Sequence, residues 1–435
     1  MALFVNREKE LDLIGNTVQA LLHHTHLSST QIIEIYGAGG MGKTALLQQV
    51  ERYCDENKLT CINVDIGHIS VSLEQDLITM IGENLLDRPS IAGKTVESAI
   101  KMLLGEGPVV MLFDAVDAAS PDQLDVLQLL LSELIDQENL FVILASKKAL
   151  PFLQKEKRVA RRLTALSLQL LSREHCEHFF TSEATQMAAE TRDLIFEWSK
   201  GYPLAINVMI AAINSGLDVR TEQGQVEILA RLKEQVIYQE ILGNIEAQRR
   251  AYYYSALQLF SLPRRFSIVI MQDLIEKFSP NLRREGVLAY LSLPKNICDT
   301  TNVMRWNMSR AGYTVDPPIR TLFLMILKQE QPDLYFAIHM FLAQKNLELA
   351  QNASGSDRVH CLREYLYHLA HSNTPSEQSL IEVTEMVSGE KPEVFVQFAE
   401  EFAQDDELKE AFGQQLPVVE AAIRRYQEKD SEGEE

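Results

Sequence analysis

Residues 31–44 read Gln31-Ile-Ile-Glu-Ile-Tyr-Gly37-Ala-Gly39-Gly40-Met-Gly42-Lys43-Thr44, and this stretch decides the fold. A β-branched apolar run ends in a glycine-rich turn with the spacing Gly37-x-x-x-x-Gly42-Lys43-Thr44. A helical pattern over residues 45–58 follows. A strand, a glycine loop with this spacing and a helix together form the Walker A P-loop in its expected context.

The residue types in this loop suit the binding of phosphate. Glycines let successive backbone N–H groups turn inward around an anion, and the new helix directs its positive end at the same anion. Lys43 adds a charge that reaches the β- and γ-phosphates, and the Thr44 hydroxyl is placed for Mg²⁺. We therefore expect ATP or ADP with Mg²⁺ as cofactors. The residues expected to surround the phosphates are Gly37, Gly39, Gly40, Met41, Gly42, Lys43, Thr44 and Ala45.

A second buried strand, predicted over residues 109–114, ends in an acid and is followed by Ala115-Val-Asp117. Open parallel sheets bind ligands at the carboxyl ends of their strands, so Asp114 is the expected Walker B ligand of Mg²⁺. Asp117 is placed to orient or deprotonate an attacking water, or it is simply a loop acid. The expected catalytic residues are Lys43, Asp114 and Asp117.

A third buried strand, predicted over residues 140–146, ends at Ser146-Lys147-Lys148. A serine and a cation at this position could read the γ-phosphate, and the lysines fit a solvated loop equally well. With another strand predicted over residues 163–171, strands and helices alternate across residues 31–172. This alternation predicts a doubly wound parallel sheet in an α/β fold.

The strand pattern stops at about residue 185, and the rest of the chain reads as helical. Gly201-Tyr202-Pro203 separates two helices, with Pro203 at a helix start. Residues 225–262 are predicted to be helical. Short helices with a β-hairpin are predicted next, followed by helical hairpins over residues 332–424.

Composition narrows the class of protein. The 435 residues carry a formal net charge of −20, which argues against a nucleic-acid or anionic-membrane binder as a whole. The five cysteines form no C-x-x-C pair, which fits a reducing compartment. No apolar stretch approaches the length of a bilayer span. We therefore expect a cytoplasmic protein that makes no membrane contact.

The order of these features resembles the STAND-class P-loop NTPases, signal-transduction ATPases that include the NACHT and NB-ARC proteins. The resemblance covers about residues 3–330 and indicates a bacterial source. Its motifs are Phe4-Val-Asn-Arg7-Glu8, the P-loop, Phe113-Asp114-Ala115-Val116-Asp117, Ser146-Lys147, Gly201-Tyr202-Pro203-Leu204 and a winged-helix-like segment around residues 259–327. The small Ala115, with Asp117 two residues later, looks more like NACHT than NB-ARC.

The resemblance implies a domain order. A P-loop nucleotide-binding domain would span residues 1–183, an AAA+-like helical lid 184–248 and a winged-helix domain 249–330. A C-terminal helical region would span 331–426, before an acidic, disordered tail over 427–435. Arg7 would contact the adenine side of the nucleotide, and Pro203 would pack near the adenine or ribose.

Three positions depart from the family pattern. Asn6 stands where the family usually has glycine, and Lys147 stands where arginine is common, which keeps the charge but loses the bidentate fork. Asp316 stands where the family often has a histidine that reaches the β-phosphate of ADP. An aspartate would repel that phosphate, so the resemblance implies an ADP lock that is weakened or made by Arg320.

The resemblance implies a molecular switch. ADP would hold it closed, ATP with Mg²⁺ would favour an open form that assembles, and slow hydrolysis would reset it. Self-association or partner proteins would use the C-terminal helices. Effector or sensor functions would be supplied in trans, or the chain is a fragment.

Two alternatives stay open. One is a scaffold that binds nucleotide without useful hydrolysis. The other is an AAA+ ATPase of the origin-recognition type that binds DNA through its winged helix. Arg264-Arg265 and Arg283-Arg284 favour the DNA reading, and the net charge opposes it.

Overall fold

The computed structural model describes residues 7–23, 30–69, 72–84, 94–182, 187–283, 285–307, 312–372, 392–421 and 423–424. Phe4-Val5-Asn6 of the entry motif, Arg284 and the expected acidic tail lie outside these residues. The chain divides into two compact units. The first holds residues 1–244 with 301–303, and the second holds 245–300 with 304–435. The finer division into domains stays a prediction.

The first unit is built on a parallel five-stranded sheet with the strand order β2-β3-β4-β1-β5. The strands are β1 (Ile32–Tyr36), β2 (Thr60–Asp65), β3 (Val109–Asp114), β4 (Leu140–Ser146) and β5 (Leu163–Ser167). The predicted parallel α/β sheet is confirmed. Since β4 lies between β3 and β1, the three chain segments that follow these strands meet at one edge of the sheet.

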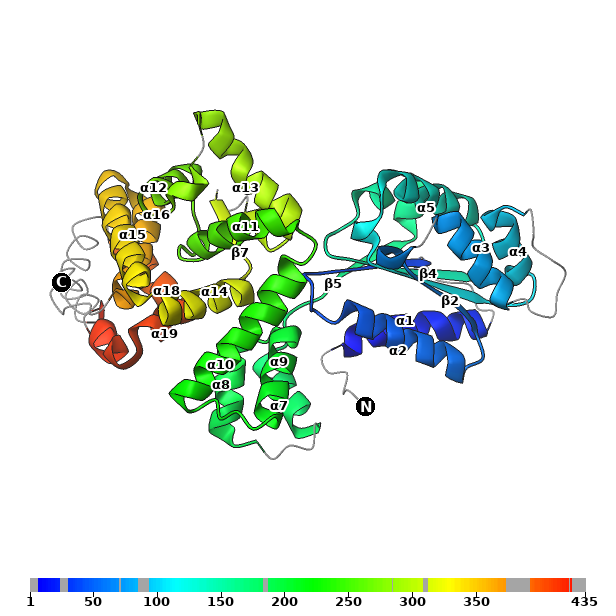
Figure 1. The fold of residues 1–435 in the computed structure, drawn as a ribbon, viewed down its shortest axis with the longest axis horizontal. Helices are drawn as coiled ribbons and strands as arrows, with labels where there is room; N and C mark the ends of the chain where they lie inside the picture. The colour runs from blue at the N-terminus through cyan, green and yellow to red at the C-terminus, as the bar shows by residue number, and fades with distance from the viewer. Residues whose placement is uncertain are drawn as a thin grey trace. The chain divides into compact units, whose positions relative to one another are not determined.

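Helices cover both faces of this sheet, as Figure 1 shows. On one face lie α3 (Leu73–Asn84), α4 (Val96–Leu104) and α5 (Pro121–Leu134), and on the other lie α1 (Glu8–Leu22) and α2 (Lys43–Glu56). Every residue of β3 and β4 is buried because each strand meets helices on both sides. A strand that is covered on both faces needs apolar side chains on both, which explains the continuous apolar runs in the sequence.

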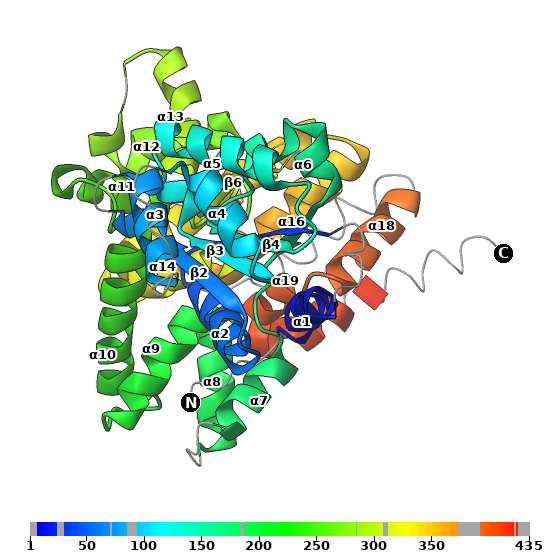
Figure 2. The same ribbon diagram turned by 90° about the vertical axis from the view of Figure 1, so that its right-hand side faces the viewer.

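Four helices and a π-helical segment follow β5 in the described part of the first unit (Figures 1 and 2). They are α7 (Arg173–Ser182), α8 (Ala189–Ser199), α9 (Pro203–Asn214), α10 (Glu222–Leu232) and η4 (Lys233–Ile241). Pro203 opens α9, where its missing N–H leaves no helix bond unmade. We use the name lid for residues 173–241, and the lid domain predicted over residues 184–248 stays a prediction.

The helical structure predicted over residues 225–262 is confirmed for most of this range, with one break in it. The chain forms α10, then η4, then leaves the helix before α11 (Ala247–Phe260). In η4 the N–H of Leu242 donates to the carbonyl of Ile237 at 2.9 Å, the wide i→i+5 bond of a π-helix. Gly243 follows directly, where a Cβ would overlap the Gln239 carbonyl. A close backbone approach of this kind ends a helix and leaves no trace in apolar periodicity.

Two predicted elements are longer than the observed ones. The strand predicted over residues 163–171 ends at Ser167. The leucine-rich stretch of residues 121–139 predicts a helix over its whole length, but the observed helix ends at Leu134. Element ends depend on tertiary contacts, which a local sequence pattern does not contain.

The described part of the second unit begins with four α-helices and a β-hairpin that lies between the third and the fourth. The elements are α11, α12 (Ile268–Phe278), α13 (Val287–Thr301), β6 (Met304–Asn307), β7 (Gly312–Val315) and α14 (Pro317–Glu330). Phe266, between α11 and α12, pairs with Tyr313 of β7, and its ring lies 5.0 Å from that of Phe260. The predicted short helices and β-hairpin are confirmed.

The unit continues with the long helices α15 (Pro332–Asn352) and α16 (Gly355–His371), which pack along each other. The helices α18 (Pro392–Ala403) and α19 (Asp406–Phe412) cover α16. An aromatic core that includes Tyr367, Phe398 and Phe402 joins them. Within the part of the chain that the structure describes, no helix has the length and apolar character needed to cross a membrane.

Candidate nucleotide-binding site

The carboxyl end of β3 and the start of α2 bring Asp114 and Thr44 into contact. The Thr44 hydroxyl donates to Oδ2 of Asp114 at 2.6 Å, and the N–H of Ala115 donates to Oδ1 at 2.8 Å. Ala115 adopts a left-handed backbone with φ +52°, which is uncommon for a residue with a side chain. Strained backbone of this kind concentrates at functional sites, and here it fixes the carboxylate that faces Thr44.

The Thr44–Asp114 pair suits Mg²⁺ in its donor chemistry. Mg²⁺ prefers hard oxygen ligands and takes one or two carboxylates, the phosphates of its nucleotide and several waters. A hydroxyl and a carboxylate oxygen 2.6 Å apart are two such ligands on neighbouring elements. The pair therefore fits the ion that the sequence predicts.

Lys43 folds over the loop that precedes it. Its Nζ donates to the carbonyls of Gly37 at 2.7 Å and Ala38 at 2.9 Å. Burial lowers the pKa of Lys43 to about 8, against the smaller opposing effect of the Asp117 charge. The ammonium is thus held at the phosphate loop with little water around it, where an anion would be bound strongly.

Ser146 joins β4 to the P-loop, and Asp117 joins the ends of β3 and β4. Asp117 lies in η2 (Val116–Ala118), and its Oδ1 accepts from the N–H of Lys147 at 2.7 Å. The Ser146 carbonyl accepts from the N–H of Gly37 at 3.3 Å, and its buried hydroxyl donates to the Lys148 carbonyl at 2.6 Å. The Ser146 side chain therefore stabilises the turn that follows β4, whereas the Asp117 side chain links the ends of β3 and β4.

The start of α9 lies directly on the P-loop. The Tyr202 hydroxyl donates to the carbonyl of Gly39. Gly40 has φ +71°, and a Cβ there would overlap Leu204 and the Tyr202 hydroxyl. These glycines thus admit the lid as well as a phosphate. Pro203 stands between the two contacting residues, so the structure brings the Gly201-Tyr202-Pro203-Leu204 motif to the loop.

Arg7 also contacts the P-loop, through a backbone carbonyl. Its guanidinium donates to the carbonyls of Met41 at 3.1 Å and Gln169 at 3.0 Å, and only 3% of the residue is exposed. Burial lowers the pKa of Arg7, with opposing charges from Glu10 and Glu8. Its observed contacts hold backbone, and the expected contact with adenine stays a prediction.

The structure thus gathers most of the predicted site at one edge of the sheet. The P-loop, Asp114, Asp117, Lys147 and Pro203 come from segments far apart in the chain. Met41 is buried, and Ala45 lies exposed on the first turn of α2. Sequence reasoning missed Tyr202, Leu204 and Glu240 as P-loop contacts. The first two stand inside a recognised motif, whereas Glu240 belongs to no motif.

Asp316 and Arg320 belong to the second unit, where both have partners. Asp316 lies 3.5 Å from Arg305, and burial raises its pKa to about 6. Arg320 pairs with Glu407 and donates to the Tyr367 hydroxyl at 2.7 Å and the Leu262 carbonyl at 3.2 Å. A lock on ADP made by Arg320 would require this buried guanidinium to leave these partners.

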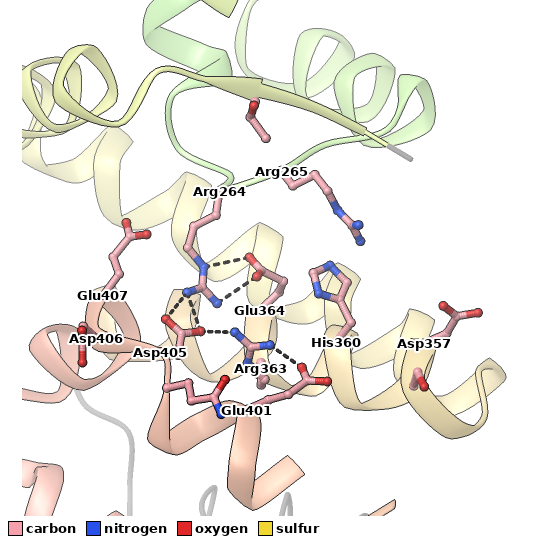
Figure 3. A pocket seen from close by; sticks show the side chains of 13 residues that line it. Arg264, Arg265, Asp357, His360, Arg363, Glu364, Glu401, Asp405, Asp406 and Glu407 are labelled. Carbon is pink, nitrogen blue, oxygen red and sulfur yellow. Dashed lines mark hydrogen bonds and ion pairs between the residues drawn. The ribbon is translucent and has the colours of Figure 1, made fainter. Parts of the chain in front are cut away.

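Figure 3 shows a polar pocket of about 700 Å³ in the second unit, where Arg264 stands between two carboxylates. It lies 2.7 Å from Asp405 and 2.8 Å from Glu364, with its guanidinium 4.5 Å from the centre of the Tyr367 ring. Arg363 also pairs with Asp405. Arg264, one of the cations that favoured the DNA reading, is therefore used inside the protein.

Comparison with known families supports the ATPase assignment. Residues 3–143 match the model of a family described as the AAA ATPase domain. This part of the chain is therefore similar to the AAA ATPase domains. No curated protein matches the sequence of the chain.

Several solved structures are similar at low identity. The ORC1 protein of Aeropyrum pernix, solved in complex with DNA, is 14% identical over 75% of this chain and 94% of that chain, with a TM-score of 0.42. A STAND protein with a tetratricopeptide repeat sensor from Pyrococcus horikoshii is 15% identical over 98% of this chain and 58% of that chain, with a TM-score of 0.35. AMPPCP-bound DnaA from Aquifex aeolicus is 17% identical over 68% and 96%, with a TM-score of 0.38. Similarity this low carries no argument about function.

Proposed function

We propose that the chain is an ATP-dependent molecular switch of the STAND class, nearer to NACHT than to NB-ARC proteins. One observation carries the proposal: the lid residues Tyr202 and Leu204 lie directly against the P-loop glycines. A ligand in the loop and the position of the lid are then linked. A ligand shifts an equilibrium only through differential contacts with the two states, and the γ-phosphate supplies such a difference between ATP and ADP.

The residues divide the work of binding and hydrolysis. Lys43 and the loop amides would hold the β- and γ-phosphates, and Thr44 and Asp114 would hold Mg²⁺. When bound, Mg²⁺ neutralises developing negative charge on the phosphates. Asp117 would orient an attacking water or accept its proton, and Lys147 would face the γ-phosphate. Turnover would be slow, since hydrolysis serves to reset the switch.

The second unit would transmit the nucleotide state. We propose that α11, α12, α13 and the β6–β7 hairpin form a winged helix, because Phe266 extends the hairpin by one antiparallel bridge to Tyr313. The C-terminal helices α15, α16, α18 and α19 would bind a partner or a second copy of the chain. A DNA-binding role has less support, because Arg264 is committed to Asp405 and Glu364.

Sizing with defined nucleotides tests the proposal. The protein stripped of nucleotide is loaded with ADP or with a non-hydrolysable ATP analogue and Mg²⁺, and its mass is measured by light scattering. We expect the ADP form to stay small and the analogue to shift the chain to a larger assembly. A Lys43→Ala chain, which lacks the phosphate contact, should keep one size in both. An unchanged mass of the wild type in both nucleotides would contradict the switch.

A further inference from the structure

An acidic side chain of the lid reaches the P-loop. Glu240 lies near the end of η4, the π-helical segment that follows α10. The same segment buries Val236, Ile237 and Ile241 within the unit, which anchors it. Segments of π-helix are rare and occur frequently at functional sites. The wide turn that precedes Leu242 and Gly243 thus carries a charged residue into the nucleotide site.

Two contacts fix where the Glu240 carboxylate lies. Its Oε1 is 3.4 Å from Nζ of Lys147, and a Cβ built on Gly39 would overlap the same carboxylate. The Glu240 side chain is 33% exposed and the Lys147 side chain is 25% exposed, so both are partly shielded from water. Glu240 and Lys147 are also among the charges that act on the pKa of Lys43. The carboxylate therefore lies beside Gly39 of the phosphate loop, paired with Lys147 and close enough to Lys43 to act on its charge.

Glu240 thereby occupies the electrostatic place of a phosphate. Lys147 follows β4 at the carboxyl edge of the sheet, where such folds bind their ligands. Lys43 serves the β- and γ-phosphates in P-loop sites. A γ-phosphate that approached both lysines would meet the like charge of Glu240 and would compete with it for Lys147. ADP has no γ-phosphate, so it does not compete with Glu240 for Lys147.

We propose that Glu240 is a latch that holds the lid against the P-loop by pairing with Lys147 at the end of β4, and that the γ-phosphate of ATP displaces it. The latch lowers the affinity for ATP relative to ADP and makes release of η4 from the loop depend on the γ-phosphate. This inference rests on the proposed function and adds the residue that distinguishes the two nucleotides.

Removal of the charge tests the latch. Glu240→Gln keeps the size of the side chain but removes its charge, and calorimetry gives the affinities for ADP and for a non-hydrolysable ATP analogue with Mg²⁺. We expect the variant to bind the analogue about 5–10-fold more tightly than the wild type, within the range of ordinary coupling energies, and to bind ADP unchanged. Glu234→Gln is the matched control, because Glu234 is an exposed acid on the same segment. It should leave both affinities unchanged.

The same substitution in a Lys147 variant tests whether Lys147 is the partner of Glu240. With Lys147→Met in place, Glu240→Gln is expected to give less than half of its gain for the analogue, because the contested cation is gone. Equal changes for the two nucleotides, no tightening of the analogue, or an undiminished gain in the Lys147→Met background would each overturn the latch. A wild type that bound neither nucleotide would instead overturn the proposed function itself.

Discussion

The Lys43→Ala chain is expected to bind ATP with Mg²⁺ about 10²–10³-fold more weakly than the wild type, since loss of one partner of a desolvated charge pair removes several kcal/mol. The ammonium lies among the P-loop carbonyls with little water around it, so no solvent cation replaces it. Calorimetric titration with a non-hydrolysable ATP analogue measures the loss. Lys148→Ala, on an exposed neighbouring lysine, is the control and should bind as the wild type does.

The lowered pKa of Lys43 adds a pH dependence to this prediction. The pKa is about 8 in the free protein because burial disfavours the charged form, so the residue loses its proton as the pH rises through that value. Binding of ATP requires the ammonium, and the affinity should fall about tenfold between about pH 7 and about pH 9. Lys43→Arg keeps its charge throughout and should show a flat profile over this range. Wild-type affinity that did not fall, or a slope shared by both chains, would remove Lys43 as the titrating group.

The Asp117→Asn chain is expected to hydrolyse ATP about 10²–10³-fold more slowly than the wild type, the usual contribution of a general base. Asparagine keeps an oxygen that can accept the Lys147 N–H, so the link between the two strand ends survives. The change therefore removes the negative charge and its basicity while it preserves the local fold. Turnover of saturating ATP measures the effect, and nucleotide affinity should stay within about twofold, since binding and chemistry are separate steps.

Asp122→Asn is the matched control for this variant, because Asp122 is an exposed acid in the first turn of α5. It should leave turnover unchanged. If Asp117→Asn kept the wild-type turnover, Asp117 would be a structural acid that joins η2 to β4, and the catalytic assignment would end.

Much of this site could be predicted from the sequence because its parts are local. The P-loop is a continuous run whose spacing is set by the phosphate it wraps. Asp114 and Lys147 follow apolar runs that can only be buried strands, and parallel strands bring their carboxyl ends to one edge. The contact between Thr44 and Asp114 at 2.6 Å follows from that arrangement.

The rest could not be predicted because it depends on contacts between distant segments. Glu240 lies in a helical stretch with no motif, and only the π-helical turn and the approach to Gly39 show its role. From the sequence, Arg264 is expected to be a surface cation. In the structure it pairs with Glu364 and Asp405, which lie 100 and 141 residues later in the chain. Charged residues of this kind reveal their partners only once the fold has placed them.

Hydrogen exchange in the lid tests most directly the central claim that the γ-phosphate controls the contact between lid and P-loop. Backbone amides of residues 233–242 are compared in the ADP complex and in the complex with a non-hydrolysable ATP analogue and Mg²⁺. The account predicts faster exchange in this segment with the analogue, because displacement of Glu240 frees η4 from the loop. Equal exchange in the two complexes, or slower exchange with the analogue, would contradict it.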